Sequence, residues 1–124
     1  MATKTLTLTK DHLKLASCFF IEEDDNSLII NKKVMLTEQS HLLDDVSLIL
    51  GLRDKMIPNT QDDAEGMAFP DEIEQYMLDT YNYVSQNIYW IELLIHQCIM
   101  SGGVEPGTYE CDTRVKIFEK KSDV

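Results

Sequence analysis

The chain has 124 residues, of which 44% are hydrophobic and 27% charged, and it carries a formal net charge of −11. This length fits a single domain over residues 1–124, and this apolar content excludes a disordered acidic tail. The longest dense apolar stretch, residues 88–100, is too short for a bilayer span, and residues 1–10 lack the apolar core of a secretory signal. We therefore expect a cytoplasmic protein that enters no membrane.

The charges are unevenly distributed along the chain. Residues 56–113 contain no Lys or Arg but eleven of the 22 carboxylates, whereas the other 66 residues balance eleven acids against eleven bases. This segregation predicts an acidic surface that suits a cationic partner, although solvating charge alone explains the same pattern. Direct nucleic-acid binding by this stretch is disfavoured, because proteins neutralise phosphates with Lys and Arg.

The N-terminal part of the chain predicts a strand, a helix and a reversal. Leu and Thr alternate over residues 5–9, which indicates a short strand, and Thr7 or Thr9 then suits the cap of a first helix. That helix should end before the acidic residues 22–25. Beyond them, apolar triplets on both sides of residues 31–33 predict a small hairpin or an extended loop.

A second helix is predicted after a cap at Thr37 or Ser40. Its apolar residues share one face, and Gly51 stands where a helix typically ends. Over residues 54–69 the periodicity is lost, and Pro58 is accompanied by several acids, which predicts a loop longer than most connections. Loops of this length are functional or mobile.

A third, long helix is predicted from Pro70 to Met100. Carboxylates fill its first turn, where the positive end of the helix dipole favours them, and thirty residues would span about 45 Å. Half of its circumference is apolar. From residue 88 onward the opposite side also carries apolar residues, so this end should be covered by the rest of the fold or by another subunit.

Residues 108–119 predict a C-terminal β-hairpin, because apolar and polar side chains alternate on both sides of a turn at 112–113. Residues 120–124 should fray. Together these elements predict an α+β, mainly helical domain in which two short helices and the hairpin pack on one long amphipathic helix.

Motifs of catalysis are absent from the sequence. It contains no G-x-S-x-G elbow, no phosphate-binding Gly-rich loop and no dinucleotide fingerprint, so no enzyme activity and no cofactor are predicted. His41 with Asp44 and Asp45 is the nearest approach to a ligand cluster, which leaves a metal-assisted hydrolase as an alternative. A surface His–Asp pair explains the same spacing, and no metal site is predicted. The three cysteines form no close pair, which predicts reduced, mostly buried thiols.

The acids of the charged stretch are the candidate binding residues. Regularly placed carboxylates suit a small acidic protein that docks on a basic protein partner, in the manner of an inhibitor or an immunity protein that occupies a basic groove. The residues predicted to bind this partner are Asp62, Asp63, Glu65, Asp71, Glu72, Glu74 and Asp79.

The second functional hypothesis is a structural or accessory protein that acts by homo-oligomerisation. Aromatic residues are enriched at interface hot spots, although Tyr and Trp at helical spacing are more often core. The long helix exceeds what the other elements can cover, which predicts a homodimer through it. The residues predicted to carry this self-association are Tyr83, Tyr89, Trp90 and Leu93.

Three stretches resemble segments of small proteins from bacteria and their mobile elements. They read LTKDHLKL at residues 8–15, DDVSLILGL at residues 44–52 and SGGVEPGTYEC at residues 101–111, about a quarter of the chain. No activity is attached to those proteins, so the resemblance implies a bacterial or mobile-element origin and assigns no functional residue.

Overall fold

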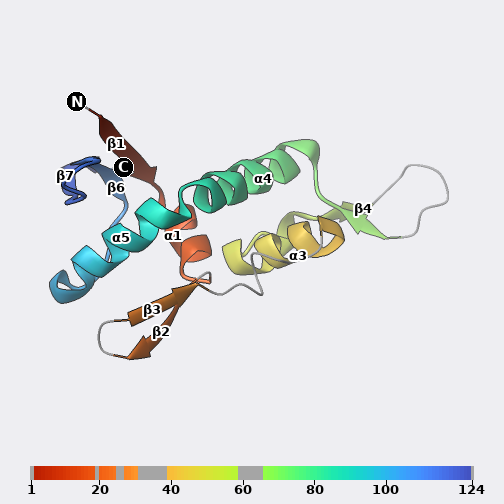
Figure 1. Cartoon of the computed structure of the whole chain (residues 1–124). Helices are drawn as coiled ribbons and strands as arrows, with labels where there is room; N and C mark the ends of the chain where they lie inside the picture. The colour runs from red at the N-terminus through yellow and green to blue at the C-terminus, as the bar shows by residue number, and fades with distance from the viewer. Residues whose placement is uncertain (1, 19, 25–26, 31–38, 59–65, 124) are drawn as a thin grey trace.

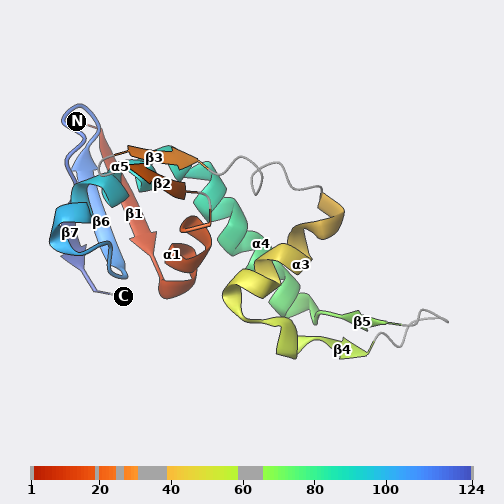
Figure 2. The same cartoon turned by 90° about the horizontal axis from the view of Figure 1, so that it is seen from below.

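The structure is a computed structural model with an α+β fold, which confirms the predicted class. Figures 1 and 2 show an elongated molecule, with a three-stranded sheet at one end and a two-stranded ribbon at the other. Helices connect the two ends. The described residues are 2–18, 20–24, 27–30, 39–58 and 66–123, and for 20–24, 27–30 and 39–41 only the backbone is described.

The three-stranded sheet brings the two ends of the chain together. β1 (Thr3–Leu8) pairs antiparallel with β6 (Gly107–Asp112), and β6 pairs antiparallel with β7 (Glu119–Ser122). Because side chains alternate along a strand, Leu6 and its partner Tyr109 share the buried face, and exposed threonines of β1 take the other. The predicted N-terminal strand is therefore confirmed as an edge of this sheet.

α1 (Lys10–Ala16) begins directly after the predicted cap, Thr9. The Thr9 hydroxyl accepts a hydrogen bond from the backbone N–H of His12 (3.3 Å), and His12 Nδ1 accepts one from the backbone N–H of Thr9 (2.9 Å). This reciprocal pair satisfies two backbone donors at the helix start. The helix also ends before the acidic residues, as predicted.

A hairpin of β2 (Phe20–Asp24) and β3 (Ser27–Ile30) follows α1. The pairing of β3 with the strand before it was not predicted, and the reversal predicted at residues 31–33 lies outside the described residues. Residues 34–36, the other candidate strand, lie outside the described residues.

α3 (Gln39–Leu50) confirms the second predicted helix, and Gly51 ends it with a φ of +70°. The region predicted as a long loop has paired ends. Figure 2 shows the paired strands extending away from the helices. In chain order, these elements are the 3-10 turn η1 (Arg53–Lys55), β4 (Ile57–Pro58) and β5 (Met67–Ala68).

The single long helix predicted over residues 70–100 is divided in two, so this prediction is wrong. α4 (Asp71–Gln86) and α5 (Ile88–Cys98) meet at Asn87, where φ is −111° and ψ is 17°. These torsion angles are not those of an α-helix, so Asn87 interrupts the helix. The 3-10 turn η2 (Ile99–Ser101) then ends α5.

The side chain of Asn87 explains the interruption. Its Nδ2 donates a hydrogen bond to the carbonyl oxygen of Tyr83 (2.8 Å), and its Oδ1 accepts one from Nζ of Lys4 (2.6 Å). A polar side chain that bonds to the helix backbone competes with regular helical hydrogen bonds. The contact with Lys4 also ties the junction of α4 and α5 to strand β1.

The C-terminal hairpin is confirmed, but its second strand lies later than predicted. β7 begins at Glu119, and residues 120–122 form part of this strand instead of fraying. Gln97 on α5 holds the connection, because its side chain donates to the carbonyl oxygen of Lys116 (2.6 Å) and accepts from the backbone N–H of Phe118 (2.8 Å).

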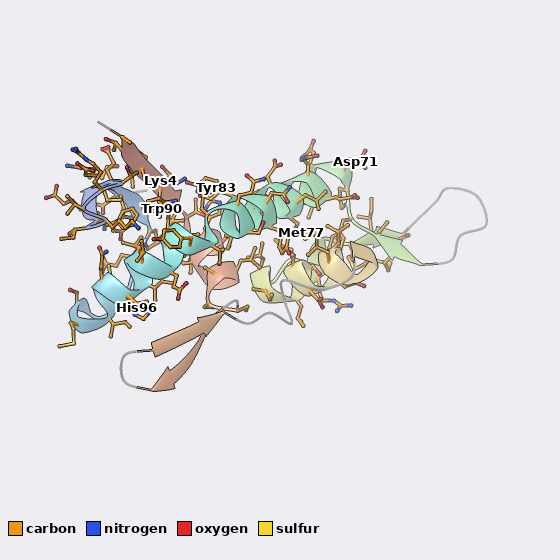
Figure 3. All side chains as sticks on the ribbon, in the orientation of Figure 1. Lys4, Asp71, Met77, Tyr83, Trp90 and His96 are labelled. Carbon is orange, nitrogen blue, oxygen red and sulfur yellow. The ribbon has the colours of Figure 1, made fainter. Side chains whose placement is uncertain are left out.

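The core lies where α1, α4 and α5 meet the sheet, and α3 extends it along α4. Both α1 and α3 contact α4 and each other. Figure 3 shows Met77 between α4 and α3. The cysteines are free; Cys111 is buried, and Cys18 and Cys98 are partly buried. The largest buried side chains are Leu6, Leu8, Leu15, Val46, Met77, Val84, Ile91 and Leu94.

Candidate partner-binding surface

Four of the predicted partner-binding residues lie on α4, and together they define the acid face: Asp71, Glu72, Glu74 and Asp79. Three of them are exposed, whereas Glu74 is partly buried. Figure 3 shows Asp71 at the end of α4 that lies away from the sheet. The remaining predictions fall outside the described residues: Asp62, Asp63 and Glu65.

The helical period places Asp71, Glu72 and Asp79, the three exposed residues of the acid face, opposite the core. α4 buries Met77, Thr80 and Val84, which recur at intervals of three and four residues. At about 100° and 1.5 Å per residue, Asp71 and Asp79 lie roughly 80° apart around the axis and about 12 Å apart along it. The two carboxylates therefore share one side of the helix two turns apart.

Helix physics alone accounts for part of this acidity. Pro70 precedes α4, and Asp71 and Glu72 occupy its first turn, where the positive end of the helix dipole stabilises carboxylates. Asp79 lies beyond that turn, where the dipole effect has faded. Its Oδ1 accepts a hydrogen bond from Nε2 of Gln75 (2.8 Å), which leaves its negative charge uncompensated.

Among the described residues, no ion pair offsets the negative charge of the acid face. The ion pairs among the described residues join Asp112 to Arg114, Glu105 and Asp123 to Lys120, and Glu119 to Lys121. All of them lie in residues 105–123, and none involves α4. Within the described part of the chain, Arg114, Lys120 and Lys121 are thus paired, while Asp71, Glu72 and Asp79 of α4 face solvent without an ion pair.

Tyr76 borders the acid face and links it to α1. Its hydroxyl donates a hydrogen bond to the carboxylate of Asp11, and this bond, with a smaller contribution from burial, raises the pKa of Tyr76. The ring remains exposed. An apolar surface therefore lies beside the carboxylates. No sequence signal pointed to the contact with Asp11, because the two residues lie far apart in the chain.

Tyr83, predicted for self-association, makes contacts inside the fold. Its hydroxyl accepts a hydrogen bond from the backbone N–H of Thr7 (3.0 Å), at the free edge of β1. Its ring lies 4.9 Å from the ring of His12, centroid to centroid. The side chain therefore joins α4 to the sheet and to α1. Figure 3 shows Tyr83 near the sheet end of α4.

The other residues predicted for self-association lie on α5. Tyr89 is 49% exposed and its hydroxyl accepts a hydrogen bond from Nζ of Lys116 (2.9 Å). Trp90 packs edge-on against Phe118, and Leu93 is partly buried. Tyr89 and Leu93 share the outer side of the helix, opposite its buried residues. An apolar stripe is thus present on α5.

Two of the three candidate metal residues have side chains that the structure describes. Asp44 is exposed and Asp45 is partly buried on α3, whereas the side chain of His41 lies outside the described residues. Among the residues that the structure describes, no group of three or more His, Cys, Asp or Glu side chains is arranged to hold a metal ion. The hydrolase alternative stays a prediction without a described site.

Exposed residues around the ribbon were missing from the predicted site. Arg53 and Lys55 on η1 are exposed, as are Ile57 on β4 and Met67 on β5. The only signal in the sequence was the unusual length of the predicted loop. The sequence did not predict that Ile57 and Met67 would lie on paired strands with their side chains exposed to solvent.

A scan against protein-family models, a search of curated proteins and a search of solved structures each found no match. Among the described helices, none combines the length and the apolar character that a bilayer crossing requires.

Proposed function

We propose that this chain is a small cytoplasmic interaction protein that binds a basic protein partner through the acid face of α4. The observation that carries the proposal is the exposure of Asp71, Glu72 and Asp79 on one helix, with no ion pair to any described residue. These carboxylates need no rearrangement of the fold before they meet Lys or Arg side chains.

The net charge favours such an encounter. A protein that carries a charge of −11 attracts a basic surface over several ångströms, which raises the association rate at low salt. Binding to a basic groove would compete with the ligand that normally occupies it. An inhibitor or immunity-type role is therefore the form of the function that this surface suits best.

The partner should present both cations and an apolar or aromatic contact. Exposed ion pairs alone contribute little free energy, about 0–1 kcal/mol each, because solvent screens them. Tyr76 offers an exposed ring beside the carboxylates, and Tyr is common among residues that dominate binding free energy.

The test is a pull-down from native lysate at low and high salt. The acid-face variant carries Asp71→Asn, Glu72→Gln and Asp79→Asn. Its matched control removes three exposed carboxylates elsewhere, through Asp44→Asn, Glu105→Gln and Glu119→Gln, so both variants change the net charge equally. Wild type and control should retain one basic protein that high salt releases, and the acid-face variant should lose it. Equal retention by the two variants would rule out the acid face.

Self-association through α5 is the second candidate function. The observation that favours it is the apolar stripe of Tyr89 and Leu93, which continues to Met100, a residue that is 93% exposed. A chain that assembles through this stripe would form dimers in dilute solution, and Met100→Glu would dissociate them without touching the core. A monomer at every concentration would reject this candidate.

A further inference from the structure

The ribbon end of the molecule exposes apolar side chains on both faces of a narrow structure. We use ribbon end for η1, β4, β5 and the first turn of α4. Ile57 pairs with Ala68 and Met67 with Pro58, so Ile57 and Met67 point to opposite faces. These two residues are 50% and 54% exposed. Figures 1 and 2 both show the ribbon projecting from the helices.

A ribbon of this kind gains little stability from its own contacts. Its strands have two residues each, and they pair with each other and not with the three-stranded sheet. Two-stranded hairpins are marginally stable in water, and exposed apolar side chains favour burial. A partner that covers the ribbon would therefore stabilise it.

The two flanks of the ribbon carry opposite charges. η1, which precedes β4, exposes Arg53 and Lys55, with Asp54 between them. α4, which follows β5, exposes Asp71 and Glu72. None of these five residues forms an ion pair with a described residue. Cations precede the ribbon and carboxylates follow it, and neither group has an ion-pair partner among the described residues.

We infer that a second copy of this chain is a partner of the acid face, and that two copies join at their ribbon ends about a two-fold axis. The inference rests on the proposed function, because the second copy supplies the cations that the acid face binds. The rotation brings Arg53 and Lys55 of one copy onto Asp71 and Glu72 of the other, and it does so twice. The ribbons pack their apolar side chains between these two sets of ion pairs.

Charge complementarity selects a second copy over a uniformly basic surface at this end of the molecule. A basic surface that covered the whole ribbon end would meet Asp71 and Glu72 favourably, but it would be repelled by Arg53 and Lys55. A second copy in two-fold register meets each charge with its opposite. The same arrangement also covers the exposed apolar residue on one face of each ribbon.

The test uses two charge-reversal variants and sedimentation equilibrium at low salt. The all-acid variant carries Arg53→Glu and Lys55→Glu, and the all-base variant carries Asp71→Lys and Glu72→Lys. Wild type should sediment as a dimer. Each variant alone should dimerise more weakly by roughly tenfold or more, because like charges then face each other. An equimolar mixture of the two should recover a one-to-one complex, since the opposite charges meet again.

Two controls locate the interface. Lys10→Glu with Lys14→Glu makes the same charge change as the all-acid variant on exposed positions of α1, and it should leave the dimer intact. Met100→Glu tests the stripe on α5 and should also leave it intact. Circular dichroism of every variant confirms that the helices are retained.

A second measurement uses the unsubstituted protein, so it stands even if the all-base variant does not fold. A carbodiimide joins an amine to a carboxylate as an amide and incorporates no atoms of its own. In an equal mixture of unlabelled and ¹⁵N-labelled chains, it should link Lys55 of one copy to Asp71 or Glu72 of the other. Mass spectrometry would identify this link by its one labelled and one unlabelled half.

The outcomes separate the inference from the proposed function. A wild-type monomer that still loses its basic lysate protein on acid-face substitution overturns the two-copy inference and leaves the proposed function standing. A dimer that both charge variants preserve, with no mixed-label link at Lys55, also overturns the inference. A wild-type dimer that the single variants weaken and their mixture restores supports it.

Discussion

The sheet end and the ribbon end of this molecule differ in how their side chains are used. At the sheet end, Leu6 and Leu8 are buried, Lys4 and Tyr83 form hydrogen bonds across the fold, and the ion pairs of residues 105–123 are formed within the chain. At the ribbon end, Ile57 and Met67 are exposed, and none of the charges there takes part in a described ion pair.

The sheet end and the ribbon end should therefore respond differently to substitution. Burial of apolar side chains is the main favourable contribution to folding, so substitutions at the sheet end should cost stability. Surface side chains contribute little to the free energy of unfolding, so substitutions at the ribbon end should change association instead.

Truncation of one core side chain at the sheet end should lower the free energy of unfolding far more than truncation at the ribbon end. Leu6 is fully buried, so Leu6→Ala should lower the free energy of unfolding by about 2–5 kcal/mol. Ile57→Ala at the ribbon end should lower it by less than about 1 kcal/mol, because that residue is half exposed. Urea denaturation of both variants measures the difference. Equal losses would contradict the division.

Gly107→Ala should disrupt the pairing of β6 and β7. A Cβ at this position would lie 2.6 Å from the carbonyl oxygen of Ser122 and 2.8 Å from Cε of Lys120. The backbone oxygen cannot yield without moving β7, so we expect a loss of about 1–3 kcal/mol. Thr108→Ala, one residue along the same strand, is the control. Backbone hydrogen exchange in β7 should accelerate in Gly107→Ala but not in Thr108→Ala.

Removal of the cap of α1 should have a smaller effect. Thr9→Ala deletes the hydroxyl that accepts the backbone N–H of His12, and losses of about 0.5–2 kcal/mol are usual for such caps. Thr9→Ser keeps the acceptor and should restore most of the stability. Thermal unfolding of the two variants gives the comparison, and an unchanged midpoint in Thr9→Ala would show that the cap contributes nothing.

The smallest effect should be a pH dependence that comes from His12. Partial burial lowers the pKa of this imidazole below its ordinary value of 6.5, and the neighbouring Asp11 opposes the shift only in part. The unfolded chain therefore binds the proton more readily, so the stabilising contribution is complete above pH 6.5 and is lost as the pH falls through the folded pKa. Protonation of Nδ1 would also remove the acceptor for Thr9.

The check on His12 compares wild type with His12→Gln by urea denaturation between about pH 7.5 and pH 5. Wild type should lose more stability than the variant over this range. Parallel curves would contradict the assignment. The lowered pKa values of Asp112 and Asp123, which arise from hydrogen bonds to Arg114 and Lys120, act only at more acidic pH.

Local patterns in the sequence predicted most of the elements. The alternation before Thr9, the cap itself and the glycine after α3 correspond to features that depend on a few neighbouring residues. The division of the long helix was missed because Asn87 is compatible with a helix locally. Its distant partner, Lys4, comes from the opposite end of the chain.

The candidate site was predicted only where helical period governs it. Spacing predicted the exposure of Asp79 on the outer side of α4, and the helix dipole favoured Asp71 and Glu72 in the first turn. Spacing did not place Tyr83, because its contacts with Thr7 and His12 depend on how the sheet packs against the helix. Arg53 and Lys55 were not singled out, because their position beside β4 depends on the tertiary fold.

Hydrogen–deuterium exchange of the wild-type protein, with and without the basic protein that it retains at low salt, locates the binding surface. We predict slower exchange in residues 67–79 and unchanged exchange in β1 and β6. Protection of the sheet with no change in α4, or a lysate that yields no retained protein, would contradict the claim that the acid face is the binding surface.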